Sequence, residues 1–157
     1  MQFKAEEYNR ELHDRWYALS VRQPYAEYIA SGVKSIEVRS RYTNYRGELM
    51  ICASSQPKMK GLESGVALCL VELYDVRPVS SFTEQDWAAT MIPKNERPTE
   101  GFGWLLRKPR RVVEHPVKGQ LGIWRLVYSK DLIIEHPKRL RYDKKSKTWV
   151  ADIFTKK

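Results

Sequence analysis

Short segments rich in Val, Ile, Leu and aromatic residues, separated by polar and glycine-containing turns, recur along most of this chain. They predict strands at 16–21, 35–39, 48–53, 65–76, 101–107 and 121–128, with a basic link that Pro109 breaks between the last two. The segment 65–76 is the longest apolar run, and Gly65 and Pro78 bound it, which favours a central strand. The strands lie too close together for a doubly wound sheet. We therefore expect an α+β fold, a small and mostly antiparallel β-barrel of about six strands.

Two or three short helices are expected around this barrel. Pro24 opens the segment PYAEYIAS and Gly32 closes it, which is the usual placement of these two residues at helix ends. Thr83 is a good N-cap for TEQDWAAT, which has acidic residues in its first turn. The segment 4–14 has apolar residues four apart and predicts an N-terminal helix.

The chain is expected to divide into three parts: an N-terminal helix within 1–15, a barrel domain over 16–128, and a basic extension over 129–157. The extension carries most of the net positive charge. Trp149, Val150, Ile153 and Phe154 give it apolar anchors, so a hairpin docked on the barrel is one interpretation and a loose arm is the other. A charge run of this kind is usually solvated, and we assign it no specific role.

Length and charge narrow the class of function. A chain of 157 residues suits one domain, and no apolar run approaches the roughly 20 residues that span a bilayer. The net charge of +9 favours polyanionic partners, with nucleic acid ahead of a membrane surface. Cys52 and Cys69 lie in apolar stretches without a CxxC pair, so we expect no metal, no cofactor and a reduced, cytoplasmic location.

The segment 19–47 concentrates polar chemistry in a predicted strand, helix, strand and turn. It contains Arg22, Gln23, Lys34, Glu37, Arg39 and Arg46. Glu37 and Arg39 share one face of their strand because residues two apart point the same way. The pair is either an ordinary surface ion pair or lies at the mouth of the barrel, where the planar guanidinium would bind a phosphate or a base.

Further basic and aromatic residues extend the predicted binding surface. Arg107, Lys108, Arg110 and Arg111 lie close together around Pro109, and we interpret them as a phosphate-contacting edge rather than a solvated hairpin turn. Lys118 and Arg125 would extend the same surface. Tyr42 and Tyr45 lie in a basic turn and are expected to be exposed for base stacking. Trp104 and Trp124 lie in strand patterns and are expected in the core.

Several motifs in one order resemble the ASCH domain, a family with a PUA-like fold. They are LSVRQPYA at 19–26, the G-x-K-x-x-E-x-R spacing from Gly32 to Arg39, RGEL at 46–49, the strand 65–76 and HPVKGQLGIWRL at 115–126. Their order is most similar to that in the domain of the activating signal cointegrator, for which the family is named. The resemblance covers 16–128.

The resemblance implies nucleic-acid binding, to RNA rather than DNA, in a cleft between the first barrel helix and the barrel. It places Lys34, Glu37 and Arg39 along that cleft, with Gln23, Pro24 and Tyr25 at its edge. A lysine just after a glycine turn can reach a phosphate, and a tyrosine beside it offers a stacking face. We therefore expect Lys34→Ala and Arg39→Ala to weaken binding without unfolding the chain.

Two other classes of function remain open. Amidohydrolases that act on N-acetylcytidine look like the same fold and use a lysine, a threonine three residues later and a distant glutamate, but here Glu37 follows Lys34 at that spacing. Glu84 and Asp86 in the second predicted helix are acidic, without a clear match to that glutamate. In a ribonuclease, Lys34 would stabilise the phosphorane and Glu37 would be the general base. A module that binds proteins in transcription coactivation is the third class; oligomeric state, base preference and strandedness stay open.

Overall fold

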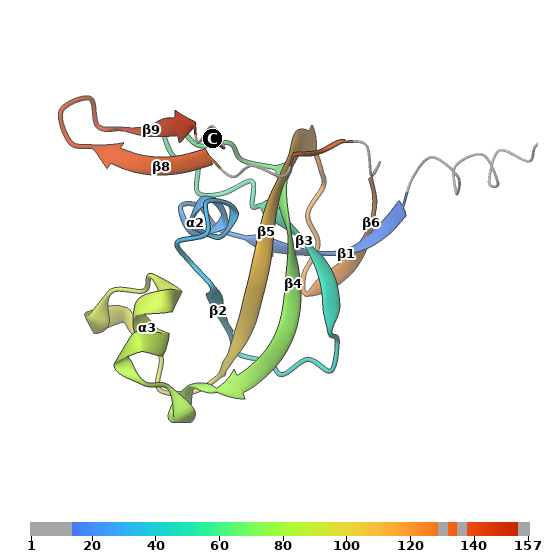
Figure 1. The fold of residues 1–157 in the computed structure, drawn as a ribbon, viewed down its shortest axis with the longest axis vertical. Helices are drawn as coiled ribbons and strands as arrows, with labels where there is room; N and C mark the ends of the chain where they lie inside the picture. Colours follow the sequence, from blue (N-terminus) through green and yellow to red (C-terminus); the bar gives the residue numbers. More distant parts are fainter. Residues whose placement is uncertain (1–13, 129–131, 135–137, 154–157) are drawn as a thin grey trace, which may run out of the picture.

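The computed structural model describes residues 14–128, 132–134 and 138–153. The helix predicted over 4–14 falls almost wholly outside these residues, and Asp14 already belongs to the first strand. Figure 1 shows a strongly curved sheet with short helices on one side. The strands are β1 (Asp14–Val21), β2 (Ile36–Arg39), β3 (Gly47–Ala53), β4 (Val66–Pro78), β5 (Phe102–Pro116), β6 (Ile123–Tyr128) and β7 (Ile133–Ile134). The helices are α2 (Tyr25–Ala30) and α3 (Glu84–Thr90), with 3₁₀ turns η1 (Val79–Ser81) and η2 (Lys94–Glu96).

The sheet is open rather than closed, so the barrel prediction is wrong in this respect. Its strand order is β2-β5-β4-β3-β1-β6, with β7 paired to β5, and among the described residues β2 and β6 are not joined. β6 begins at Ile123 opposite Leu19, so the last residues of β1 extend beyond that ladder. The α+β class and the mostly antiparallel pairing are confirmed, since β1 with β3 is the one parallel pair among the described strands of this sheet.

β5 runs straight through the proline that was expected to end it. The predicted break between two strands at Pro109 is wrong because the strand accommodates the ring at a bulge. Arg107 pairs with Glu72 and Arg110 pairs with Leu70, so Lys108 and Pro109 together face one residue of β4. Proline has no N–H for the ladder and is tolerated at such bulges. Lys108 adopts a φ of 54° to make the turn.

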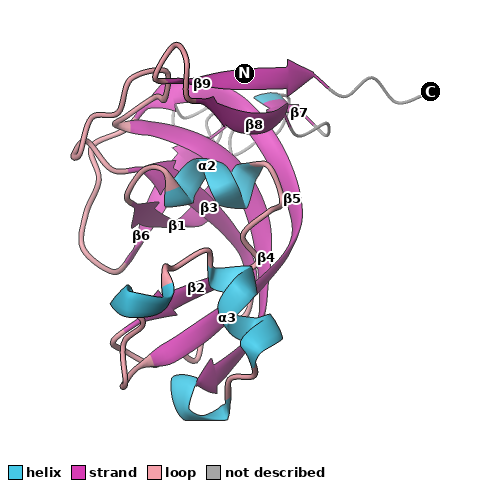
Figure 2. Ribbon diagram, turned by 90° about the vertical axis from the view of Figure 1, so that its left-hand side faces the viewer, coloured by secondary structure: helices cyan, strands magenta, loops and turns pink. Residues whose placement is uncertain are grey.

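Apolar clusters pack on both faces of the sheet. Figure 2 shows α2 lying across one face, where Ile29 belongs to the same buried cluster as Leu49 and Trp104. The opposite face buries Met50, Leu70 and Trp124. Both tryptophans are therefore core residues, as predicted, and Cys52 and Cys69 are buried free thiols.

Local sequence signals set the helix ends. The Thr83 hydroxyl accepts from the Asp86 N–H at 3.2 Å, and the Asp86 carboxylate accepts from the Thr83 N–H at 2.9 Å, so the predicted N-cap of α3 is confirmed. Gly32, with a φ of 86°, follows the end of α2. Residues of the C-terminal extension form an antiparallel hairpin, β8 (Lys138–Asp143) and β9 (Thr148–Ile153). No helix in the described ranges has the length and apolar character to cross a membrane.

Candidate nucleic-acid interface

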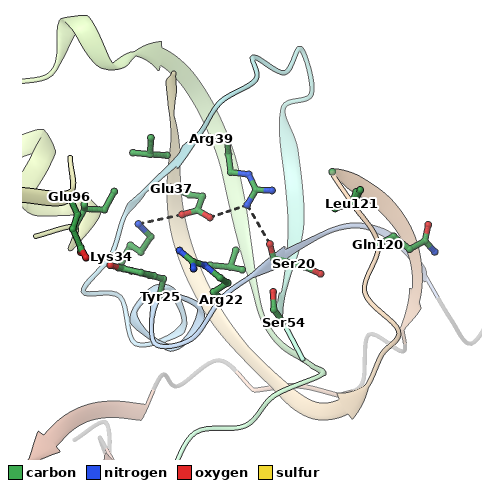
Figure 3. A pocket seen from close by; sticks show the side chains of 14 residues that line it. Ser20, Arg22, Tyr25, Lys34, Glu37, Arg39, Ser54, Glu96, Gln120 and Leu121 are labelled. Atoms are coloured by element: carbon green, nitrogen blue, oxygen red, sulfur yellow. Dashed lines mark hydrogen bonds and ion pairs between the residues drawn. The ribbon is translucent and has the colours of Figure 1, made fainter. Parts of the chain in front are cut away.

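A cleft of about 650 Å³ opens where the sheet fails to close, between β2 and the end of β1. Its size is within the range of small-ligand sites. Figure 3 shows side chains from β1, α2, β2 and the loop before β6 around it. The lining residues are Ser20, Val21, Arg22, Tyr25, Lys34, Glu37, Val38, Arg39, Ser54, Ile92, Glu96, Gln120, Leu121 and Gly122.

Arg39 connects β2 to β1 across the open seam, which is the gap between β2 and the end of β1 where the sheet does not close. Its Nη1 lies 3.4 Å from the Ser20 carbonyl oxygen of β1 and 3.4 Å from Glu37 Oε2 of its own strand. Glu37 and Arg39 therefore share a face, as the two-residue spacing predicted, and that face lines the cleft. The Arg39 side chain is 31% exposed, so its guanidinium remains accessible to a ligand.

Lys34 is part of the cleft wall rather than an exposed cation. Its Nζ donates to the Thr90 carbonyl at 2.6 Å and the Ile36 carbonyl at 2.8 Å, and lies 3.4 Å from Glu37 Oε1. These three acceptors match the three donors of an ammonium group. Burial lowers the pKa of Lys34 below its ordinary value, and the nearby Glu37 carboxylate opposes this shift. The expectation of a lysine that reaches out to a phosphate does not fit this geometry.

Tyr25 and Arg22 bring an aromatic ring and a second guanidinium to the cleft from the start of α2. The Tyr25 ring lies 5.1 Å from Lys34 Nζ, measured to its centroid, and Arg22 is exposed. Burial, and next the Glu96 carboxylate, raise the pKa of the Tyr25 hydroxyl, so this hydroxyl stays neutral and can donate a hydrogen bond at neutral pH. Figure 3 places Glu96 on the Tyr25 side of the cleft, away from Leu121.

Two residues predicted at the cleft edge support α2 instead of lining the cleft. The Gln23 side chain is buried; its amide nitrogen donates to the Glu63 carbonyl at 2.9 Å and its amide oxygen accepts from the Glu27 N–H at 3.0 Å. Pro24 occupies the N-cap position of α2. Both residues therefore hold the helix that presents Tyr25.

The basic turn before β3 lies outside the cleft. Tyr42 is exposed, as predicted, with the Arg46 guanidinium 5.8 Å from its ring centroid. Tyr45 is only half exposed, which corrects the expectation of a free stacking platform. Its ring packs 4.5 Å from that of Tyr17, centroid to centroid, and its hydroxyl donates to the Glu48 carbonyl. We therefore place neither tyrosine nor Arg46 at the candidate site.

The basic run on β5 does not form one surface. Arg107 and Lys108 are exposed and pair with Glu72 at 2.8 and 3.2 Å, while Arg110 pairs with Glu48. Arg111 points to the other side and is buried, where it forms a bidentate ion pair with Glu27 of α2. Its assignment as a phosphate contact is therefore wrong, because strand alternation turns it inward. Lys118 is exposed in the loop before β6.

The Glu72 cluster predicts a pH dependence of stability. Hydrogen bonds from Arg107, then from Lys108, lower the pKa of Glu72 from 4.5 to about 2. A lowered folded-state pKa stabilises the fold above pH 4.5, and this contribution disappears as the pH falls toward 2. Glu72→Gln should therefore melt at a lower temperature than the parent near neutral pH, with the difference vanishing near pH 2. The effect should be small and sensitive to salt, since the pair is at the surface. A difference that persists at pH 2 would contradict this assignment.

The family comparison agrees with the motifs. The model of the ASCH domain matches residues 19–152. The chain belongs to the ASCH domain family. Activating signal cointegrator 1 of Homo sapiens is 30% identical over 140 residues, covering 74% of this chain and 23% of the relative. The protein of the same name from Mus musculus is 29% identical over 141 residues, with the same coverage. The chain thus spans under a quarter of the length of these relatives.

Solved structures show the same fold. The crystal structure of ASCH from Zymomonas mobilis superposes with a TM-score of 0.58 at 14% identity, covering 70% of this chain and 86% of that chain. At this identity the likeness concerns the fold alone. It supports an open ASCH-type sheet with the two helices described here.

The motif reasoning assigned part of the ASCH cleft and left the rest of its lining unassigned. It predicted Arg22, Tyr25, Lys34, Glu37 and Arg39, which the fold brings together. It did not assign Ser20, Ser54, Glu96, Gln120 or Leu121 to the cleft, although Ser20 lies in the motif at 19–26 and Gln120 and Leu121 lie in the motif at 115–126. Ser54 and Glu96 lie in loops without a distinctive pattern.

The acidic residues of α3 have other roles. Glu84 pairs with Arg97 at 3.1 Å, and Asp86 caps its helix and pairs with Arg77 at 2.9 Å. Neither lines the cleft, so Glu96 is the second carboxylate there, beside Glu37. In the part of the chain that the structure describes, no three His, Cys, Asp or Glu residues gather as metal ligands would.

Proposed function

We propose that this ASCH domain binds RNA and that one unstacked nucleotide of a single strand occupies the cleft. The observation that carries the proposal is the convergence of Arg22, Arg39 and the Tyr25 ring on one open cleft. Proteins that read RNA commonly take bases out of the stack, place them against aromatic rings and bond their edges. The net charge of +9 supports a polyanionic ligand.

The exposure of each side chain indicates which residues of the cleft contact the ligand. The two guanidiniums are accessible and can bind phosphate oxygens or base edges bidentately. The Ser20 and Ser54 side chains supply hydroxyls that can donate or accept. The Lys34 ammonium already has three acceptors, so it holds Glu37 and the wall in place rather than contacting the ligand.

Charge-matched variants test this proposal. Arg22→Ala and Arg39→Ala should each weaken the binding of a fluorescein-labelled single-stranded RNA about tenfold, measured by fluorescence anisotropy. The salt slope should also fall by roughly 0.7 for each phosphate contact removed. Arg15→Ala removes the same charge at the far end of β1 and should have little effect. Equal losses for all three variants would contradict a specific cleft and indicate general attraction. A DNA strand of the same sequence should bind more weakly, because it lacks the 2′-hydroxyl.

A hydrolase acting on RNA or a modified nucleoside is the second candidate. A buried lysine beside a carboxylate, in a cleft, is a type of pair often found in active sites. Against it, every Lys34 donor is occupied, so the ammonium has none left for a developing negative charge. A denaturing gel separates the two functions. RNA that the parent protein shortens and the Glu37→Gln variant leaves intact would favour the hydrolase. RNA that stays intact and shows a salt-sensitive mobility shift would favour binding. If neither result is obtained and the chain captures a protein instead, this would indicate an interaction module.

A further inference from the structure

A second hollow of about 360 Å³ adjoins the cleft. The two share Ser20, Ser54, Gln120 and Leu121, so they form one groove that continues past the end of β1. The second hollow is otherwise lined by Ala53, Ser55, Gly65, Val117 and Gly119. These residues are mostly small or polar, so the hollow suits part of a nucleotide better than a large apolar group.

Leu121 lies in the loop where the two hollows meet, and its exposure is unusual. The residue is 100% exposed, so it contributes nothing to the described core. It nevertheless lines both hollows, and Figure 3 shows it on the loop that faces Ser20 across the cleft. A fully exposed leucine at a groove boundary is costly in water and gains most when a ligand covers it.

The loop that carries Leu121 is fixed against the sheet. The Val117 N–H donates to the Gly65 carbonyl at 2.9 Å. A Cβ at Gly119 would lie 2.7 Å from Ser20 Oγ, so the loop passes close to β1 at this point. Gly122 has a φ of 66°, a conformation that favours glycine. The loop is therefore anchored at Val117 and again at Ile123, where β6 begins, and Leu121 lies between these two points.

We propose that the second hollow holds the neighbouring nucleotide of the same RNA strand and that Leu121 separates the two bases. This inference rests on the proposed function and specifies its ligand as at least two linked nucleotides. Apolar side chains inserted between successive bases unstack them in other nucleic-acid complexes. Here the wedge would keep one base in the cleft against Tyr25 while its neighbour enters the second hollow.

The test uses RNA with 2-aminopurine beside a purine, since 2-aminopurine brightens when it leaves the stack. The parent protein should raise its fluorescence on binding. Leu121→Ala should lose most of this rise and bind the RNA about fivefold more weakly, because one apolar contact is removed. Leu121→Met should retain both properties. Val127→Ala, at an exposed apolar residue of β6, should match the parent. A single nucleoside monophosphate, which fills only the cleft, should bind equally to the parent and to Leu121→Ala.

The outcomes separate this inference from the proposed function. If the parent binds no RNA, both fail. If Arg22→Ala and Arg39→Ala weaken binding while Leu121→Ala keeps the parent's affinity and fluorescence, the RNA site stands and the wedge is wrong. If Leu121→Ala weakens binding of the single nucleotide as much as that of the strand, Leu121 is a wall of the cleft and the two-subsite arrangement is wrong.

Discussion

Replacing Arg111 with methionine is expected to lower the free energy of unfolding by about 4 kcal/mol, because it removes the guanidinium that neutralises a buried carboxylate. The Arg111 and Glu27 side chains are 5% and 6% exposed, and the guanidinium joins β5 to α2 through both of its terminal nitrogens. Urea denaturation measures the loss. Since α2 carries Tyr25 at the cleft, the ion pair also holds this helix in position for the site.

Two controls define the cause of this loss. Arg107→Met removes an exposed arginine from the same strand, at 51% side-chain exposure, and should change stability far less. The double variant Glu27→Leu/Arg111→Met should recover much of the stability, because a buried ion pair can often be replaced by apolar side chains. An Arg111→Met protein that is as stable as the parent but binds RNA poorly would contradict the structural role and restore Arg111 as a ligand contact.

Lys34→Met is expected to lower the free energy of unfolding by about 3 kcal/mol, in contrast to the expectation from the sequence that Lys34 can be replaced without unfolding the chain. The substitution leaves the Ile36 and Thr90 carbonyls and one Glu37 oxygen without their donor. Arg39 still pairs with Glu37, which keeps the loss below that at Arg111. Urea denaturation again measures the change, with Lys58→Met as the exposed control.

The pH dependence gives a second readout for Lys34. Burial lowers its pKa below 10.5, so the unfolded chain binds more protons than the folded chain as the pH approaches 10.5. The parent should therefore gain stability relative to Lys34→Met as the pH rises through this window. A parallel pH dependence for both proteins, or an unchanged free energy of unfolding, would indicate that Lys34 is not held as described.

Local patterns predicted the elements well because neighbouring residues determine them. The Thr83 cap, the glycine after α2 and the long apolar run of β4 each gave an element close to its observed bounds. The shared face of Glu37 and Arg39 also followed from strand periodicity alone. These features need no knowledge of the rest of the chain.

The features that sequence reasoning missed depend on contacts between distant residues. Pro109 looked like a break, and only the pairing with β4 shows that a bulge absorbs it. Arg111 and Lys34 looked like exposed cations, but Glu27 and the Thr90 carbonyl, both far away in sequence, bury and satisfy them. Leu121 was predicted to begin a strand, but it lies in the loop before β6, and only the fold places it beside the groove.

The open seam of the sheet also determines how the domain can adapt. Backbone ladders hold neighbouring strands about 4.8 Å apart and resist separation. In the part of the chain that the structure describes, β2 and the end of β1 share no ladder, and the Arg39 guanidinium bonds the Ser20 carbonyl oxygen instead. The sheet therefore separates more easily at this seam than between any two strands that share a ladder. If RNA binds in the cleft as proposed, Arg39 would exchange the Ser20 oxygen for an oxygen of the RNA, and β2 would then move away from the end of β1 without the loss of a ladder hydrogen bond.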